Sequence, residues 1–488
     1  MDKSNLSVQQ SQGVPIPIWL VVGANWQQYC DEAGVKWANN CGFTGKNGQI
    51  LLIPDPLQQT RHVLYCRKNN EFWDFADLAH QLPAPAIYKI MNPLSIEEAT
   101  LAAFAWAAAS YSFDHYVVKE KSVFAQRALP GGGDLQRLYP WIDGTALVKE
   151  KAVFPQLVLP ENADLARLYP WIDGTALVRD LMNTPTNTNG PAAELIQQAQ
   201  VLAGRHGAVC RVLTGEELLE NNFPLIHAVG QTSQPPCLIE LVWSGHATGP
   251  RLTLIGNGIC LDSNEEIRSS AHNLLIKKDM GGAAHILALA QMIMMVGLPL
   301  QLRVLLPVLE KSMSGHPMRL DVLESRKGLT IEVGNTDTEG RLMLADALTA
   351  ACEDGPDLII DCATLTNAAS IALGPDIPVL FSNHDAWTQK LLHSSHMTQD
   401  PLWQLPLFQP YARHLQSPIA DLNNVGKSSY GGAITAALFL EKFIEPRIPW
   451  IHIDMMAWNP TAAAGRPEGG EAMGLRALFH LIHQWVMV

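Results

Sequence analysis

The chain has 488 residues, of which 47% are hydrophobic and 17% charged, a composition typical of a globular protein with two or more domains. Its 34 lysines and arginines against 47 acidic residues give a formal net charge of −13 with no basic run, so we predict no nucleic acid and no membrane surface as a partner. The eight cysteines form no CxxC pair and the chain starts with a polar stretch, which indicates reduced thiols in a cytoplasmic protein rather than a zinc ribbon or a secreted protein.

The N-terminal region has the pattern of an α/β domain. Two short runs rich in β-branched residues, 18–22 and 49–54, predict strands, and the alanine-rich stretch 95–111 predicts a helix. We therefore predict a smaller α/β domain over residues 1–148.

A tandem duplication follows this region. Residues 119–148 recur at 149–178, with 22 of 30 positions identical. Two copies are too few for a solenoid, which needs about three units or more, and neither copy holds a set of metal ligands or a nucleophile. We interpret residues 149–180 as a duplicated segment and linker at a domain junction.

The rest of the chain, residues 181–488, alternates strand and helix patterns. This alternation predicts an α/β domain with a doubly wound, mostly parallel sheet flanked by helices. The apolar stretch 283–302 carries His285 and Gln291 and is broken by Gly297 and Pro299, so we interpret it as a buried helix and not as a membrane span. The predicted strands are 207–214, 237–245, 251–261, 300–309, 328–333, 357–365 and 448–458.

The stretch "VGNTDTEGRLMLADAL" (333–348) sets charges at Asp337, Glu339 and Arg341, each two residues from the next. It joins a strand pattern to a helix pattern, and in an extended segment these three side chains would share one face. Two close carboxylates repel each other unless a cation lies between them, and a divalent metal ion is one such cation. The alternative is a solvated turn with a surface ion pair.

Two further acids lie at the ends of predicted elements. Asp262 ends the apolar run 251–261, and Asp279 precedes the long helix near 281. If the strands are neighbours, these acids would meet Asp337 and Glu339 at one edge of the sheet, where four carboxylates favour Mn or Mg and also accept Zn. Alternatively, Asp262 and Asp279 are a helix cap or turn residues.

The stretch "NTDTEGRLMLADAL" resembles the NTDAEGR signature of the leucine aminopeptidase family, the M17 cytosol aminopeptidases. The resemblance covers roughly residues 180–488. It implies an N-terminal and a catalytic α/β domain, commonly a homohexamer, and removal of N-terminal residues from peptide substrates with a free N-terminus. The further matching stretches are "KKDMGGAA" (277–284), "DCATLT" (361–366), "ADLNNV" (420–425), "GGAITAALFLEKF" (431–443) and "GRPEGGEA" (465–472).

The resemblance also implies roles for individual residues. It makes Arg341 the holder of a bicarbonate and places Thr364, Leu365 and Asn367 where substrate binds. It implies two divalent metal ions (Mn, Zn or Mg), which would lower the pKa of a bridging water and polarise the scissile carbonyl. The implied carboxylate ligands are Asp262, Asp279, Asp337 and Glu339.

The chain departs from the family pattern at several of these places. Asn257 stands where the family has a metal-ligating lysine, and Arg268 is the nearest equivalent of a second lysine that stabilises the oxyanion, in a loop one residue shorter than the family's. Asn264 and Glu265 replace two glycines, and Asn367 replaces a third.

These departures leave three hypotheses. The first is a metallo-aminopeptidase with an altered site and reduced activity. The second is an impaired or inactive family member with a structural or binding role. The third, a nucleic-acid-binding role known for some bacterial relatives, has no support from the acidic charge balance.

Overall fold

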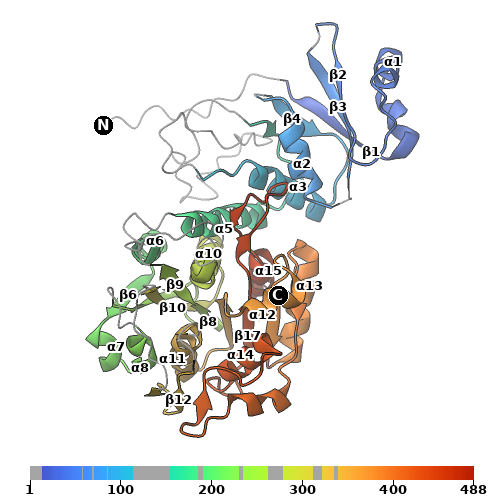
Figure 1. Ribbon diagram of the computed structural model, residues 1–488. Helices are drawn as coiled ribbons and strands as arrows, with labels where there is room; N and C mark the ends of the chain where they lie inside the picture. Colours follow the sequence, from blue (N-terminus) through green and yellow to red (C-terminus); the bar gives the residue numbers. More distant parts are fainter. Residues whose placement is uncertain are drawn as a thin grey trace. The chain divides into compact units, whose positions relative to one another are not determined.

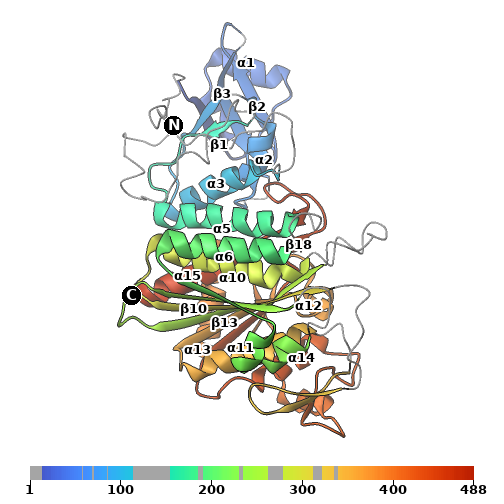
Figure 2. The same cartoon turned by 90° about the vertical axis from the view of Figure 1, so that its left-hand side faces the viewer.

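The computed structural model shows a two-domain α/β protein, as the sequence predicts (Figures 1 and 2). The first compact unit comprises Met1–Ile172 and Ala462–Pro467, and the second comprises Asp173–Thr461 and Glu468–Val488. The structure describes residues 14–57, 59–68, 71–84, 86–113, 154–184, 191–229, 235–261, 278–311, 321–334 and 339–487.

The first unit is built on a five-stranded sheet with the order β2-β3-β1-β4-β5. All neighbouring strands are parallel except β2 and β3. The strands are β1 (Ile16–Val21), β2 (Ile50–Pro54), β3 (Thr60–Cys66), β4 (Ile87–Ile90) and β5 (Gln156–Leu157), and the helices are η1 (Gly23–Tyr29), α1 (Glu32–Asn40), α2 (Asp74–Gln81), α3 (Ile96–Ala109) and the first part of α5 (Leu165–Asn183).

Helix α3 confirms the helix predicted over residues 95–111. It begins with a capping box, in which Ser95 Oγ accepts a hydrogen bond from the Glu98 backbone N–H and the Glu98 carboxylate accepts one from the Ser95 N–H. Its alanines and aromatic residues are buried nearly all the way round, which explains why the stretch shows little amphipathic pattern.

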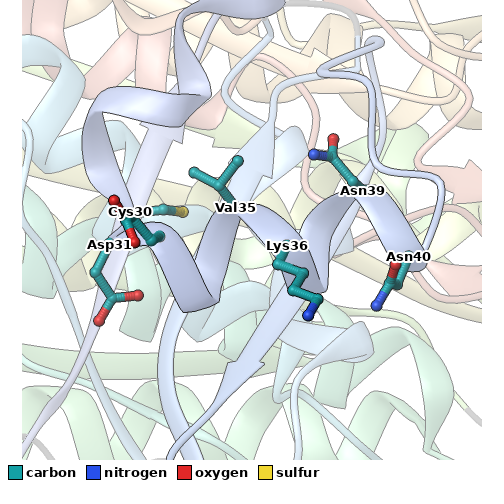
Figure 3. Close-up of a pocket in the computed structure, with 7 residues that line it drawn as sticks. Cys30, Asp31, Val35, Lys36, Asn39 and Asn40 are labelled. Carbon is teal, nitrogen blue, oxygen red and sulfur yellow. The ribbon is translucent and has the colours of Figure 1, made fainter.

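A shallow hollow of about 560 Å³ lies along α1 in the first unit (Figure 3). Its lining residues all belong to this one helix and the two residues before it. Asp31 caps the helix and forms an ion pair with Arg61, and burial raises the pKa of the Cys30 thiol, which keeps it protonated. The hollow therefore lacks an activated nucleophile.

The second unit is built on a nine-stranded, mostly parallel sheet. The strand order is β15-β14-β17-β13-β8-β10-β7-β6. Strand β9 is not part of this order: β10 pairs first with β8 and then, further along its length, with β9. The pairs β17–β13, β13–β8 and β8–β10 are parallel, which confirms the predicted sheet type. Its strands are β6 (Val209–Thr214), β7 (Cys237–Ser244), β8 (Arg251–Gly256), β9 (Gly258–Leu261), β10 (Gln301–Lys311), β13 (Leu358–Ala363), β14 (Val379–Ser382), β15 (Trp403–Gln404) and β17 (Trp450–Asp454).

Helices cover both faces of this sheet (Figure 2). Helices α6 (Pro191–His206) and α10 (Gly281–Val296) lie on one face, and α11 (Glu339–Glu353) and α14 (Gly432–Glu441) lie on the other. The remaining elements of this unit are α7 (Glu216–Glu220), α8 (Pro224–Ala228), η2 (Lys278–Met280), β11 (Val322–Glu324), β12 (Thr330–Glu332), α12 (Asn367–Leu373), α13 (Asp385–Thr398), η4 (Gln409–Leu415), β16 (Leu422–Asn423), β18 (Trp458–Asn459), β19 (Gly469–Gly470) and α15 (Leu475–Met487).

Helix α10 is a core helix, as its sequence predicts. The helical stretch Lys278–Val296 is long and apolar enough to cross a membrane by composition alone, but 83% of its most apolar window is buried inside the protein. His285 Nδ1 lies 2.6 Å from the Gly281 carbonyl oxygen, and its Nε2 accepts a hydrogen bond from the Met473 N–H. Burial lowers the pKa of His285 to about 4, so the ring is neutral and both nitrogens are used.

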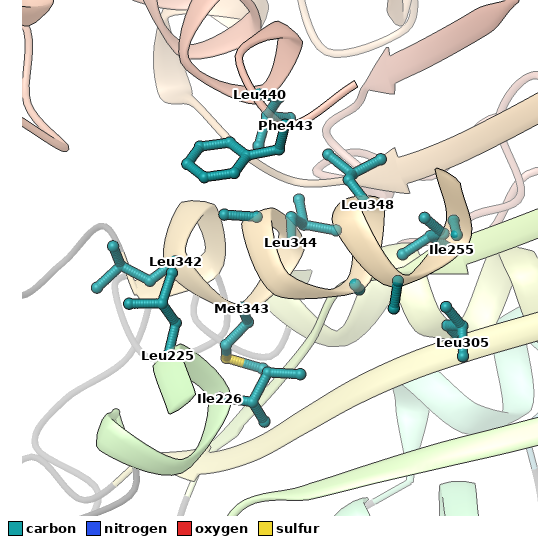
Figure 4. Packing of buried hydrophobic residues seen from close by; sticks show 14 of the residues in the cluster. Leu225, Ile226, Ile255, Leu305, Leu342, Met343, Leu344, Leu348, Leu440 and Phe443 are labelled. Carbon is teal, nitrogen blue, oxygen red and sulfur yellow. The ribbon is translucent and has the colours of Figure 1, made fainter. Parts of the chain in front are cut away.

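An extensive hydrophobic cluster of the second unit holds α11 against the sheet (Figure 4). Leu342, Met343, Leu344 and Leu348 of α11 are each at most 1% exposed. They pack among residues of β8, β10, α8 and α14, so the start of α11 is held rigidly beside the sheet. The neighbours labelled in Figure 4 are Ile255, Leu305, Leu225, Ile226, Leu440 and Phe443.

All eight cysteines are described and none is in a disulfide. Five of them, Cys66, Cys237, Cys260, Cys352 and Cys362, are buried.

Candidate active site

The carboxyl ends of β8, β13 and β17 meet at one edge of the second sheet. The parallel register pairs Gly256 with Cys362 and Ala363 with Asp454, so the residues that follow these strands emerge side by side. Ligands of open α/β sheets bind at such an edge. The residues that follow β8 and β13 are Asn257 and Thr364, both predicted site residues.

Asn257 interrupts what the sequence predicts as one strand over 251–261. Its backbone N–H donates to the Cys362 carbonyl oxygen at 3.1 Å and its carbonyl oxygen accepts from the Ala283 N–H at 2.8 Å, so β8 and β9 are separate strands joined at this residue. The side chain is 2% exposed, and its Oδ1 has no hydrogen-bond partner within the described parts of the chain. A buried amide oxygen without a partner is costly, and a cation could satisfy it.

Asp279 lies in η2, directly before α10. Its Oδ1 accepts a hydrogen bond from Thr364 Oγ1 at 3.1 Å and forms an ion pair with Lys278 Nζ at 2.7 Å. Asp279 and Thr364, which are 85 positions apart in the chain, are therefore brought together by the fold. The following Gly282 permits this approach, because a Cβ there would lie 2.2 Å from the Cys362 carbonyl oxygen.

Glu339 and Arg341 lie in the first turn of α11, and the prediction that they share one face of an extended segment is wrong. The helix begins at Glu339, where residues two positions apart point about 200° apart. Gly340, between them, faces Asn257, since a Cβ at Gly340 would lie 2.6 Å from Asn257 Nδ2. The start of α11 therefore lies at the same sheet edge as Asn257, but as a helix and not as the predicted extended segment.

Arg341 is 8% exposed and donates from Nη1 to the Asn424 carbonyl oxygen at 2.6 Å. Its Nε has no hydrogen-bond partner within the described residues. Burial lowers the pKa of Arg341 to about 10, although the Asp454 charge acts in the opposite direction, so the guanidinium stays charged at neutral pH. A buried cation with a free donor can hold an anion.

Asp454, at the end of β17, is a buried acid that the sequence reasoning missed. Its carboxylate accepts hydrogen bonds from the backbone N–H groups of Leu365 and Thr366 and from Thr366 Oγ1. These bonds fix the turn between β13 and α12, and Asn367 begins α12 directly after Thr366. Burial raises the pKa of Asp454, and its hydrogen bonds act in the opposite direction. The only signal in the sequence is an acid at the end of an apolar strand.

Three predicted site residues, Asp262, Arg268 and Asp337, lie outside the described residues, as do Asn264 and Glu265. Within the described ranges, no three His, Cys, Asp or Glu side chains form a group that could hold a metal ion. The described donors at this edge are the carboxylates of Asp279 and Glu339 and the amide oxygen of Asn257, and oxygen ligands suit hard divalent cations. The chemistry of this donor set therefore fits such an ion.

Two family models match the chain. The model described as "Cytosol aminopeptidase family, catalytic domain" matches residues 176–479, and the model described as "M17 aminopeptidase, N-terminal domain" matches residues 16–130. The chain belongs to the cytosol aminopeptidase family. The family resemblance seen in the sequence is thereby confirmed.

Curated relatives match a little under two thirds of the chain. A "Probable cytosol aminopeptidase" of Syntrophotalea carbinolica is 40% identical over 311 residues, which is 62% of this chain and 62% of that relative. "Peptidase B" of Cronobacter sakazakii is 39% identical over 314 residues, which is 62% of this chain and 73% of that relative. The chain thus matches less than two thirds of the length of the first of these relatives.

Solved structures match nearly the whole chain. The crystal structure of cytosol aminopeptidase from Coxiella burnetii is 39% identical, with a TM-score of 0.84 and coverage of 98% of both chains. The bottromycin maturation enzyme BotP in complex with Mn is 27% identical, with a TM-score of 0.78 and coverage of 96% of this chain and 99% of that one. The family fold therefore extends over both units.

Proposed function

We propose that this protein is a divalent-metal-dependent aminopeptidase of the leucyl type, which removes N-terminal residues from peptides. The observation that carries the proposal is the meeting of Asn257, Asp279 and Thr364 at the carboxyl ends of β8 and β13 in a chain of the cytosol aminopeptidase family. A buried amide oxygen without a described partner and a carboxylate lie at the same sheet edge.

Two divalent ions would be held by the carboxylates of Asp262, Asp279, Asp337 and Glu339, with Asn257 as an oxygen donor. When bound, such ions lower the pKa of a water molecule and polarise a carbonyl group. The Mn complex of BotP favours Mn, and Zn and Mg suit the same oxygens.

The chain's own side chains would position the peptide. Thr364 and Leu365 lie in the turn that Asp454 fixes and Asn367 begins the helix directly after it, and this stretch would bind the substrate backbone. Arg341, with its unused Nε donor within the described chain, would hold a bicarbonate, and Arg268 would provide positive charge for the developing oxyanion.

A second candidate function is a structural or binding role with impaired catalysis. The observation that favours it is the neutral Asn257 at the position where the family has a lysine. A lost transition-state donor costs about a hundredfold to a thousandfold in rate, so several departures together could silence the enzyme.

One assay separates the two functions. The purified protein is incubated with Mn, Co or Zn and with leucine p-nitroanilide or Leu-Gly. Turnover that disappears in Asp337→Ala and in Glu339→Ala would reject the structural role. No detectable turnover by the folded, metal-loaded protein, together with measurable turnover by the double variant Asn257→Lys, Arg268→Lys, would instead establish the impaired member.

We also propose that the protein is a cytoplasmic homo-oligomer, with the hexamer as the expected state. The name of the curated relatives and the absence of disulfides among the eight described cysteines support the location. Light scattering coupled to size-exclusion chromatography measures the oligomer mass directly, and a monomer would contradict the proposal.

A further inference from the structure

A histidine and an aspartate form a buried pair inside the second sheet. His452 of β17 and Asp361 of β13 lie opposite each other in the parallel register. His452 Nδ1 lies 2.6 Å from Asp361 Oδ1, and Trp450 Nε1 donates to Asp361 Oδ2 at 2.6 Å. The side chains of His452 and Asp361 are both fully buried. The fold therefore places an imidazole and a carboxylate in contact where water screens them little.

Asp454 is a second buried acid on the same face of β17. It follows His452 by two positions in the strand, and residues two apart in a strand point to the same side. Burial lowers the pKa of His452, but the charge and hydrogen bond of Asp361, together with the charge of Asp454, outweigh burial and raise this pKa above its ordinary value. The two acids therefore favour the imidazolium form of His452.

Uncharged groups complete the surroundings of His452. The rings of Phe381 from β14 and of Trp450 stack on the imidazole, each with a centroid distance of 6.0 Å. His452 Nε2 is buried and has no hydrogen-bond partner within the described residues. The influence of His452 on Asp454 therefore acts through space and not through a hydrogen bond.

The acid on which His452 acts is the one that fixes the turn after β13. Burial raises the pKa of Asp454, and the charge of His452 is the largest of the influences that lower it. The others are hydrogen bonds from Thr366 and the charge of Lys278. An ionised carboxylate accepts hydrogen bonds roughly twice as strongly as a neutral acid. The charge on His452 thus strengthens the bonds that Asp454 accepts from Leu365 and Thr366.

We propose that His452 is a positioning residue for the substrate-binding turn, residues 364–366. Held as an imidazolium by Asp361, it keeps Asp454 ionised, and the ionised carboxylate holds the turn in place. The charge of Arg341 on α11 also interacts with Asp454, but the hydrogen bond described for Arg341 goes to a backbone carbonyl oxygen. This inference rests on the proposed function, because that function assigns the turn to the peptide substrate.

Hydrogen–deuterium exchange of the turn in His452→Gln tests this role. Glutamine removes the charge and keeps a polar side chain, so Asp454 binds a proton up to a higher pH. We expect the amides of Leu365 and Thr366, followed by mass spectrometry of peptic peptides, to lose about tenfold of their protection at pH 6 relative to the unaltered protein. The loss should disappear at pH 9, because Asp454 ionises there without His452.

The aminopeptidase assay reads the same role on substrate. With leucine p-nitroanilide at pH 6, the KM of His452→Gln should exceed that of the unaltered protein by about tenfold, whereas kcat should change by about threefold or less. The reason is that the turn would bind the substrate backbone equally in the ground state and in the transition state. The two KM values should converge at pH 9.

Two further variants separate charge from packing. His480→Gln removes another buried histidine of the same unit, whose Nδ1 lies 3.0 Å from Ser394 Oγ, and is expected to leave the turn protected at both pH values. Asp361→Asn keeps His452 but removes the acid that holds its charge, so it should repeat the loss at pH 6. Asp361→Asn also provides the comparison if circular dichroism shows that His452→Gln is unfolded.

Two results would overturn the inference. Unchanged protection in His452→Gln at pH 6 would show that Asp454 does not depend on His452, and an equal loss at pH 6 and pH 9 would show a packing defect and not a lost charge. The exchange measurement needs no turnover, so it is distinguishable from the proposed function. A protein inactive on leucine p-nitroanilide whose His452→Gln variant shows the pH-dependent loss would retain the role of His452 in the turn and reject the peptidase.

Discussion

At the scale of single residues, Gly340 decides how closely α11 approaches Asn257. A Cβ at this position would lie 2.6 Å from Asn257 Nδ2, a separation that real side chains do not tolerate. We expect Gly340→Ala to lower the free energy of unfolding by up to about 2 kcal/mol, because overpacking of about 1–3 kcal/mol outweighs a helix-propensity gain of about 1 kcal/mol. Urea unfolding measures the change.

The matched control for this substitution is Gly204→Ala in α6. A Cβ at Gly204 meets nothing within 4 Å, so we expect a gain of up to about 1 kcal/mol from helix propensity alone. Equal stabilisation by both substitutions would contradict the close approach of α11 and Asn257.

Asp346 of α11 is a buried acid whose ionisation is linked to stability. Its Oδ2 accepts from the Leu225 and Ile226 N–H groups, and its Oδ1 accepts from the Arg326 N–H. Burial raises the pKa of Asp346 from 3.8 to about 7, and these hydrogen bonds oppose the rise. The native state therefore binds a proton between pH 4 and pH 7 that the unfolded state does not bind.

This linkage predicts a pH dependence with a definite sign. The contribution of Asp346 to stability is greatest at low pH and is lost as the pH rises to about 7. The asparagine of Asp346→Asn cannot titrate. The free energy of unfolding of the unaltered protein minus that of the variant should therefore increase by about 1.4 kcal/mol for each unit by which the pH is lowered from 7 to 5.

Urea unfolding at pH 5, 6, 7 and 8 measures this difference. Asp421→Asn is the control. Hydrogen bonds from Thr330 lower the pKa of Asp421, so the contribution of Asp421 to stability is lost only at a more acidic pH. The difference in unfolding free energy between the unaltered protein and Asp421→Asn should therefore stay constant from pH 5 to pH 8. A pH-independent difference for Asp346→Asn would show that the native carboxylate does not take up the proton.

The family motifs name Asp279 and Thr364 as site residues, and the structure places their side chains in hydrogen-bond contact, although the motifs did not predict that contact. Asp454 and Lys278 were missed, because an acid ending a strand and a lysine beside an acid have ordinary solvated interpretations in a sequence. Only the parallel pairing of β13 with β17 and the burial of η2 place them at the sheet edge.

At the scale of elements, the packing of α11 on the sheet holds the start of the helix at the site (Figure 4). Leu348 is fully buried. We expect Leu348→Ala to cost about 2–5 kcal/mol in the free energy of unfolding, from lost burial and the cavity left behind. Leu219→Ala on α7, where the side chain is 43% exposed, should change it by about 0.5 kcal/mol or less, and equal losses would show that α11 is not packed as described.

Hydrophobic patterns predicted the long elements well. The runs at 18–22, 49–54, 237–245, 300–309 and 448–458 correspond to β1, β2, β7, β10 and β17. The two-residue strands β5 and β15 are too short to have a periodic pattern, and the break between β8 and β9 at Asn257 depends on hydrogen bonds to Cys362 and Ala283. Such breaks arise from tertiary contacts, which a local pattern does not record.

At the scale of the whole molecule, the two family models and the two compact units divide the chain in similar ways. The N-terminal model falls within the first unit, and most of the catalytic model falls within the second. The duplication, residues 119–178, spans the gap between the two models and overlaps the ends of both, at 119–130 and at 176–178. The second copy, 149–178, contains β5 and most of α5, whereas the first copy, 119–148, lies outside the described residues.

The second copy has residues that suit the packed positions of the first unit. Leu157 of β5 is 8% exposed, and the equivalent residue of the first copy is Arg127. The Asn162 side chain donates a hydrogen bond to the Leu94 carbonyl oxygen, and the first copy has Gly132 there. The second copy therefore fits the fold better, and we expect residues 119–148 to be dispensable.

Two deletions of equal length test this expectation. Removing 119–148 or 149–178 gives proteins that differ at the 8 of 30 positions where the copies differ. Without 119–148, Leu157 and Asn162 remain. The melting temperature should then stay within about 3 °C of that of the full chain, which corresponds to a change of about 1 kcal/mol in the free energy of unfolding. Without 149–178, Arg127 takes the place of the buried Leu157, and burying an unpaired charge should lower the melting temperature by more than this or prevent folding. Differential scanning calorimetry distinguishes the two, and equal melting of both products would mean that the copies are interchangeable in the fold.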